Sequence, residues 1–143
     1  FNCRFGDPET QPIMLRLESD LVELCLKACD GKLDEVKSQW NPKASLGIVL
    51  AAEGYPGDYR KGDEISGLPQ SAVENEKVFL AGVEAKAGKL VTNGGRVLCA
   101  TALGDSVFEA QQKALKLAEQ IQWNGRFYRR DIGYRAVARE QKK

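Results

Sequence analysis

Residues 90–121 read LVTNGGRVLCATALGDSVFEAQQKALKLAEQI and contain the strongest signals for the fold. Two apolar runs flank the Asn-Gly-Gly segment at 93–95, and an Asn-Gly pair between such runs is typical of a β-hairpin because both turn positions favour positive φ. Further along, Ser106 and Glu109 have the spacing of a capping box at the start of a helix. The stretch therefore predicts a hairpin followed by a long helix.

The predicted helix carries one continuous apolar stripe and an opposite face that is polar or charged. The stripe consists of Val107, Ala110, Ala114, Leu117, Ala118 and Ile121. Apolar residues at this spacing line a single helix face. We expect this helix to cover a sheet and not to carry ligand-binding side chains.

Further short strands are predicted by apolar and partly β-branched runs. They lie at 46–52, around 63–65 and at 78–81, in addition to the hairpin strands at 90–92 and 97–101. A turn-forming cluster at 54–57 ends the first of them. We read that cluster as a turn, with a loop at the mouth of a site as the alternative, and Tyr55 and Tyr59 as packing groups. The predicted fold class is α+β: a small, mostly antiparallel β domain with one long packed helix.

Residues 1–42 have a different pattern. Two helical segments are predicted, at 12–17 and 21–28, and the stretch at 40–43 then interrupts the pattern. Pro42 disfavours helical backbone in the residue before it. We therefore expect residues 1–42 to be the end of one domain and residues 43–143 to be a second domain.

Composition excludes several classes of function. The chain has 21 Lys and Arg against 20 Asp and Glu, a net charge of +1, with 43% hydrophobic residues. So balanced a charge argues against nucleic acid or a membrane surface as partner. The longest apolar runs are a few residues, far short of the roughly 20 that span a membrane.

Cys25 and Cys99 have apolar sequence neighbours, and the chain has no histidine. Cys25 and Cys29 share a helix face, but a tetrahedral zinc site needs two further ligands. Cys3 and Cys99 do not complete such a set with familiar spacing. We expect buried thiols, which suit a reducing cytoplasm.

The segment at 2–11 reads NCRFGDPETQ and concentrates directional polar groups. Asn2 offers an amide oxygen, a ligand that Mg²⁺ accepts. The planar fork of Arg4 suits a carboxylate or phosphate, with an ordinary surface ion pair as the alternative. Asp7 and Glu9 could hold an ammonium group, or cap the helix that follows Pro8.

Four segments occur in the order found in one known family. They are 2–11, 45–56 (SLGIVLAAEGYP), 92–98 (TNGGRVL) and 131–136 (DIGYRA). Together they resemble the phosphoribosylamine–glycine ligases, also called glycinamide ribonucleotide synthetases, which are ATP-grasp enzymes of purine synthesis. Members are several-fold longer, so the resemblance implies a C-terminal portion. Residues 1–42 would end the ATP-grasp domain, and residues 43–143 would form the C-terminal domain.

The resemblance also implies a reaction and a set of roles. Glycine, 5-phosphoribosylamine and ATP would be the substrates of a cytoplasmic ligase that needs Mg²⁺ or Mn²⁺. Asn2 would bind metal together with a Glu one residue before Phe1, and Arg4 would be catalytic. Asp7, Glu9 and Arg96 would bind substrate, Arg96 through the ribose phosphate. The fragment alone would be inactive, because the rest of the polypeptide supplies most of the ATP site.

Two other interpretations stay open. The chain could end another ATP-grasp ligase or carboxylase, although the segment at 4–9 argues against this. It could also contain a non-catalytic, hybrid-type binding module. A carrier module needs a lysine at a tight hairpin tip, and the expected tip at 93–94 has none. For Arg96, a purely structural place in a tight turn is the alternative to phosphate binding.

Overall fold

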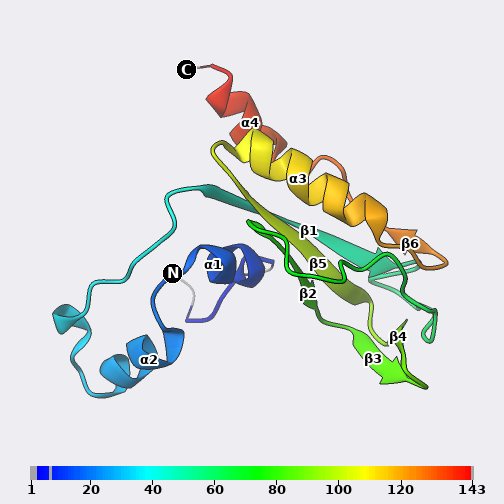
Figure 1. Ribbon diagram of the computed structural model, residues 1–143, viewed down its shortest axis with the longest axis horizontal. Coiled ribbons are helices and arrows are strands. Elements are labelled where there is room, and N and C mark those ends of the chain that lie inside the picture. The colour runs from blue at the N-terminus through cyan, green and yellow to red at the C-terminus, as the bar shows by residue number, and fades with distance from the viewer. Residues whose placement is uncertain (1–2, 7, 143) are drawn as a thin grey trace.

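The computed structural model describes residues 3–6 and 8–142. Its centre is a four-stranded antiparallel sheet with the strand order β2-β5-β1-β6. Helix α3 runs along one face of this sheet and α1 lies against the other (Figure 1). The α+β class predicted from the sequence is confirmed.

The elements have the following bounds. The central sheet contains β1 (Ala44–Ala52), β2 (Glu76–Leu80), β5 (Arg96–Gly104) and β6 (Arg126–Phe127). A two-stranded sheet contains β3 (Val83–Lys86) and β4 (Lys89–Thr92). The helices are α1 (Thr10–Arg16), α2 (Leu21–Cys29), the 3-10 helix η1 (Leu33–Glu35), α3 (Val107–Gln120) and α4 (Tyr134–Glu140).

The core lies between α3 and the β1–β5 pair. Ile48 pairs with Ala100 and Leu50 with Leu98, so their side chains share the face that α3 covers. The helix contributes the predicted stripe, of which Leu117 and Ile121 are 2% and 0% exposed. Burial of this stripe holds the helix on the sheet, and the prediction for this element is confirmed.

Side-chain acceptors bind several backbone N–H groups in the first turn of α3 and just before it. Ser106 Oγ accepts from the Glu109 N–H at 3.1 Å, as the capping box predicts. The Glu109 carboxylate accepts from the Asp105 N–H at 2.7 Å. Glu140 of α4 accepts from the Val107 and Phe108 N–H groups at 2.8 and 3.2 Å. The C-terminal helix is thereby tied to the start of α3.

The predicted hairpin at 93–95 is wrong. β4 pairs with β3 across a turn at Ala87 and Gly88, whose φ angles are 50° and 79°, whereas β5 pairs with β1 and β2. The glycine after Asn93 instead lets two backbone segments lie close together: a Cβ on Gly82 would be 2.5 Å from the Gly94 Cα. The chain therefore leaves one sheet and enters the other at this point.

Two further expectations need correction. The stretch at 63–65 forms an isolated bridge between Glu64 and Val91, not a strand. Three of the four cysteines, Cys3, Cys25 and Cys29, are exposed, and Cys99 alone is buried. Among the described residues the apolar face of α2 has no partner, so the apolar sequence neighbours of Cys25 do not bury its thiol.

The N-terminal helices differ in how they pack. α1 contacts both β1 and β5, and its Pro12 lies over Gly47, where a Cβ would be 3.3 Å from Pro12 Cγ and 2.9 Å from Cys99 Sγ. Helix α2 begins at a well-formed cap on Asp20 but has no buried residue. It lies apart from the sheet (Figure 1). Within the described residues no helix has the length and apolarity needed to cross a membrane.

Thiol chemistry tests this arrangement. In the native chain we expect a coloured aromatic disulfide to react rapidly with the three exposed thiols and slowly with Cys99, which is 2% exposed and lies beneath α1. Burial also raises the pKa of the Cys99 thiol, so little thiolate is present. The slow thiol should be released by denaturant and be absent from Cys99→Ala. Four thiols reacting rapidly in the native chain would contradict the packing of α1.

Candidate functional site

A β-bulge in the β1–β5 pair directs Arg96 toward the α1 face of the sheet. Leu50 pairs with Leu98, but the next residue, Ala51, pairs with Arg96, so the register skips Val97. Val97 and Leu98 both lie in the core, 0% and 1% exposed. A bulge of this kind re-aims the side chains beside it. Arg96 therefore lies on the face opposite α3.

Arg96 and Arg4 line one groove between the N-terminal segment and the sheet. Its volume is about 460 Å³. One wall consists of Arg4, Phe5, Gly6, Pro8, Thr10 and Gln11, and the other of Val49, Ala81, Arg96, Leu98 and Cys99. Among the described residues that line it, the two arginines are the charged ones. Residues 92 positions apart in sequence thus form a site suited to an anion.

The N-terminal wall is shaped by local hydrogen bonds. The Gly6 N–H donates to Glu9 Oε1 at 2.5 Å, and the Glu9 N–H donates to the Gly6 carbonyl at 3.3 Å. The Arg4 Nη1 donates to the Phe5 carbonyl at 2.7 Å. Glu9 is also the N-cap residue of α1, without a side-chain bond to that helix. One carboxylate oxygen of Glu9 is therefore engaged in shaping the turn.

Two predicted site residues, Asn2 and Asp7, lie outside the described residues. Of the others, Arg4 and Arg96 line the same groove, and Glu9 lines its neighbour. In the part of the chain that the structure describes, no three His, Cys, Asp or Glu side chains are grouped so as to hold a metal ion.

A second groove of about 500 Å³ adjoins the first and shares Pro8, Val49 and Arg96 with it. It is more apolar, and its aromatic lining comes from Tyr55, Phe127 and Tyr128. The loop after β1 brings Tyr55 here, with the Arg96 Cζ 6.0 Å from the ring centroid. From the sequence we expected Tyr55 to be a packing group. The signal available in the sequence was Gly95, because a residue without a side chain leaves room for a ring beside Arg96.

Cys99 lines the first groove but is unsuited to act as a nucleophile. Its Sγ lies 3.4 Å from Thr101 Oγ1, and burial raises the pKa of the thiol. A raised pKa keeps the thiol protonated at neutral pH. The chain has no histidine, and among the described residues of this groove the charged side chains are Arg4 and Arg96.

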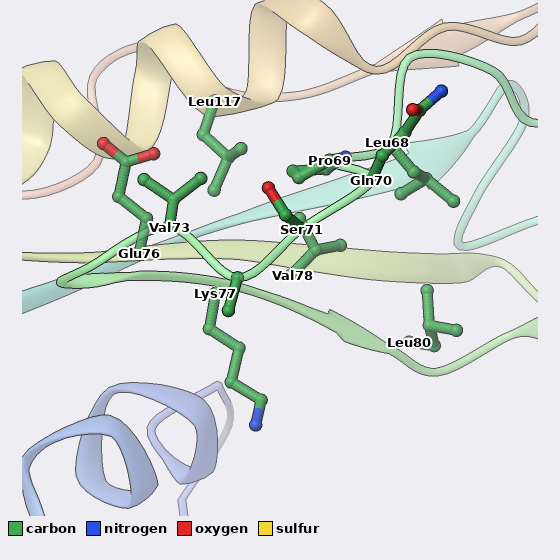
Figure 2. Close-up of a pocket in the computed structure, with 11 residues that line it drawn as sticks. Leu68, Pro69, Gln70, Ser71, Val73, Glu76, Lys77, Val78, Leu80 and Leu117 are labelled. Atoms are coloured by element: carbon green, nitrogen blue, oxygen red, sulfur yellow. The ribbon is translucent and has the colours of Figure 1, made fainter.

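A third groove, of about 440 Å³, lies at the β2 edge of the sheet and is mainly apolar (Figure 2). Val73, Val78 and Leu117 lie around it. Glu76 and Lys77 are the charged residues among its described lining. It has no convergent set of polar groups of the kind that orients a small ligand, so the groove lined by the two arginines is the stronger candidate.

Together these features define a small α+β domain with a cationic groove between an N-terminal segment and its sheet. The family model described as "Phosphoribosylglycinamide synthetase, C domain" matches residues 45–135. The chain therefore belongs to this family.

Individual relatives match this chain over all or nearly all of its length. A protein named phosphoribosylamine–glycine ligase from Haemophilus influenzae is 87% identical over 143 residues, which is 100% of this chain and 33% of the relative. A protein of the same name from Salmonella typhimurium is 63% identical, covering 99% of this chain and 33% of its own length. The chain thus spans about a third of the length of the curated relatives it matches.

A solved structure has the same fold. The crystal structure of phosphoribosylamine–glycine ligase from Thermotoga maritima aligns with a TM-score of 0.76 at 42% identity. The alignment covers 91% of this chain and 32% of that one.

The loop that carries Tyr55 is held by an ion pair with a pH-dependent contribution. The Arg60 Nε donates to Asp63 Oδ2 at 2.9 Å and the Nη2 donates to Oδ1, which lowers the pKa of the Asp63 carboxyl. A folded-state pKa below the unfolded value gives stabilisation that is full above about pH 4 and is lost as the pH falls through the folded pKa.

We therefore expect the thermal midpoint of the native chain to fall more steeply than that of Asp63→Asn between about pH 5 and about pH 3. Asp34→Asn, a change at an exposed residue of η1, is the matched control and should retain the native slope. Parallel pH profiles for the native chain and Asp63→Asn would show that the ion pair contributes nothing to stability.

Proposed function

We propose that this chain is the C-terminal third of a phosphoribosylamine–glycine ligase. The full protein would join glycine to 5-phosphoribosylamine, with ATP converted to ADP and phosphate and glycinamide ribonucleotide as the product. The observation that carries the proposal is identity over the full length of this chain with proteins of that name. The groove lined by Arg4 and Arg96 supports it, because two of the three substrates carry phosphate.

The proposed domain division places residues 1–42 with the ATP-grasp domain and residues 43–143 in a C-terminal domain. Helix α2 supports the first part, since Val22 and Leu26 are 66% and 62% exposed and lack a partner within the described chain. Such a helix needs an apolar partner to be stable in a folded protein. α1, by contrast, packs on the sheet, so the two proposed domains meet at the groove.

In the proposed mechanism the glycine carboxylate attacks the γ-phosphoryl group of ATP and displaces ADP. The amine of phosphoribosylamine then attacks the carbonyl carbon of the acyl phosphate. The C–O bond to phosphate breaks, the amine loses a proton, and an amide remains. Charge accumulates on phosphoryl oxygens in both steps, and a positioned guanidinium lowers the energy of such charge.

We assign Arg4 to the reacting phosphoryl or carboxylate group and Arg96 to the ribose phosphate. Their placement on opposite walls of one groove supports this division, since a phosphorylated sugar amine has its charge and its nucleophile at opposite ends. Asp7 and Glu9 would hold the amino groups of the substrates. For Glu9 this leaves Oε2, because Oε1 accepts from Gly6.

The same proposal includes a divalent metal, Mg²⁺ or Mn²⁺. The donor chemistry of Asn2 fits, because an amide oxygen is a hard ligand, and a carboxylate from outside this chain would complete the site. The metal would neutralise charge on the ATP phosphates.

The first test is ADP release by the full-length protein with Mg²⁺-ATP. We expect release only when both glycine and freshly made phosphoribosylamine are present, with glycinamide ribonucleotide formed in equal amount. The 143-residue chain alone should release none, because it lacks most of the ATP site. ADP release that does not depend on glycine would overturn the proposed reaction.

The second test separates the two arginines. Arg96→Ala should raise the KM for phosphoribosylamine by roughly 10- to 100-fold, the usual effect of losing charge-assisted hydrogen bonds. The KM for glycine should change little. Arg4→Ala should mainly lower kcat. Arg130→Ala is the control, because Arg130 is exposed and paired with Glu119 away from both grooves. Equal effects of Arg96→Ala on all three KM values would remove it from the phosphate site.

A further inference from the structure

Gly95 is required by an aromatic ring and not by a turn. Gly95 is absent from the residues with positive φ, so backbone freedom does not explain it. A Cβ built on Gly95 would lie 2.2 Å from Cδ2 of Tyr55 and 2.9 Å from Cε1 of Tyr59. Every other residue would displace these rings. Tyr55 is therefore seated directly against the backbone that precedes Arg96.

The Tyr55 ring also faces the guanidinium of Arg96. The Arg96 Cζ lies 6.0 Å from the centroid of the ring, within the range of a cation–π interaction. The Tyr59 ring also packs near the Tyr55 ring, with centroids 6.4 Å apart and planes tilted by 59°. Arg96 is exposed, and a long exposed side chain samples many rotamers unless a neighbour restricts it.

The loop that carries Tyr55 is itself tied to the sheet. The Ala52 N–H donates to the Gly95 carbonyl at 2.8 Å and the Tyr55 N–H donates to the Ala52 carbonyl at 3.2 Å. At its far end, the Gly62 N–H donates to the Thr92 carbonyl at 2.6 Å. The ring is thus fixed relative to β5, the strand that carries Arg96.

We propose that Tyr55 is a positioning residue, whose ring holds the Arg96 guanidinium at the wall between the two grooves so that it binds the phosphate end of a phosphorylated sugar. The inference rests on the proposed function for the identity of that sugar, phosphoribosylamine. The geometry of Tyr55, Gly95 and Arg96 does not depend on it.

The probe is ribose 5-phosphate, and its dissociation constant is measured by calorimetry on the full-length protein. Tyr55→Leu should weaken binding by roughly 2- to 30-fold, the range for loss of a cation–π contact. Tyr55→Phe keeps the ring and should bind as the native protein does. In an Arg96→Ala background Tyr55→Leu should have no further effect, because Tyr55 acts through Arg96.

Kinetics of the same variants give the second readout. Tyr55→Leu should raise the KM for phosphoribosylamine by a similar factor, and leave kcat and the KM for glycine within twofold. A purely structural role would shift all parameters together. If Tyr55→Leu does not fold, pentafluorophenylalanine at position 55 preserves the ring size and reverses its charge distribution, and it should weaken ribose 5-phosphate binding as Leu would.

The outcomes separate the two proposals. If the ligase is active but Tyr55→Leu leaves the dissociation constant of ribose 5-phosphate unchanged, the positioning role alone is overturned. An inactive protein that still binds ribose 5-phosphate through Tyr55 and Arg96 overturns the ligase reaction and keeps the site. No binding by the native protein, or full additivity of Tyr55→Leu with Arg96→Ala, overturns the positioning role.

Discussion

The antiparallel pairing of β1 with β5 is the constraint on which the rest of the structure depends. Up to Leu50 its register places one set of side chains under α3 and the other set under α1. The skipped residue, Val97, then places two consecutive β5 side chains in the core and moves Arg96 to the opposite face. If Val97 were paired in a regular register, Arg96 would lie on the same face as Leu98, toward the α3 core, where burying a charge is costly. The β-bulge at Val97 therefore places Val97 and Leu98 in the core and Arg96 at the candidate site on the opposite face.

The two faces of the sheet are built for different tasks. The α3 face carries large apolar side chains, as a core requires. On the other face the residues around Gly47 are small, Cys99 and Thr101, and α1 comes so close that a Cβ on Gly47 would be 3.3 Å from Pro12 Cγ. This close approach brings the segment at 4–11 beside β5 and forms the groove that Arg4 and Arg96 line. The groove therefore depends on the packing of α1 against the sheet.

The long helix and the fold class were predictable because their signals are local: a capping box, a stripe and short apolar runs. The absence of a hairpin at 93–95 was not predictable from local sequence. The glycine after Asn93 lets the backbone come close to Gly82, and that contact depends on how the strands are arranged. The bulge at Val97 has no signature in sequence, since it arises from the pairing of two strands. Exposure of Cys25 and Cys29 was missed because burial of α2 depends on a partner that local sequence does not reveal. For the candidate site, the residue types of Arg4 and Arg96 predicted anion binding, which stays a prediction; their shared groove and the contact between Tyr55 and Arg96 could be found only from the fold.

The proposed ligase requires that these arginines serve a phosphorylated substrate and not only the surface of the domain. The measurement that tests this most directly is a crystal structure of the full-length protein with glycinamide ribonucleotide bound. The account predicts the ribose phosphate within hydrogen-bonding distance of the Arg96 guanidinium, with the Tyr55 ring against that guanidinium and the glycyl end toward Arg4. A ribose phosphate bound elsewhere, with Arg96 directed to solvent, would contradict it.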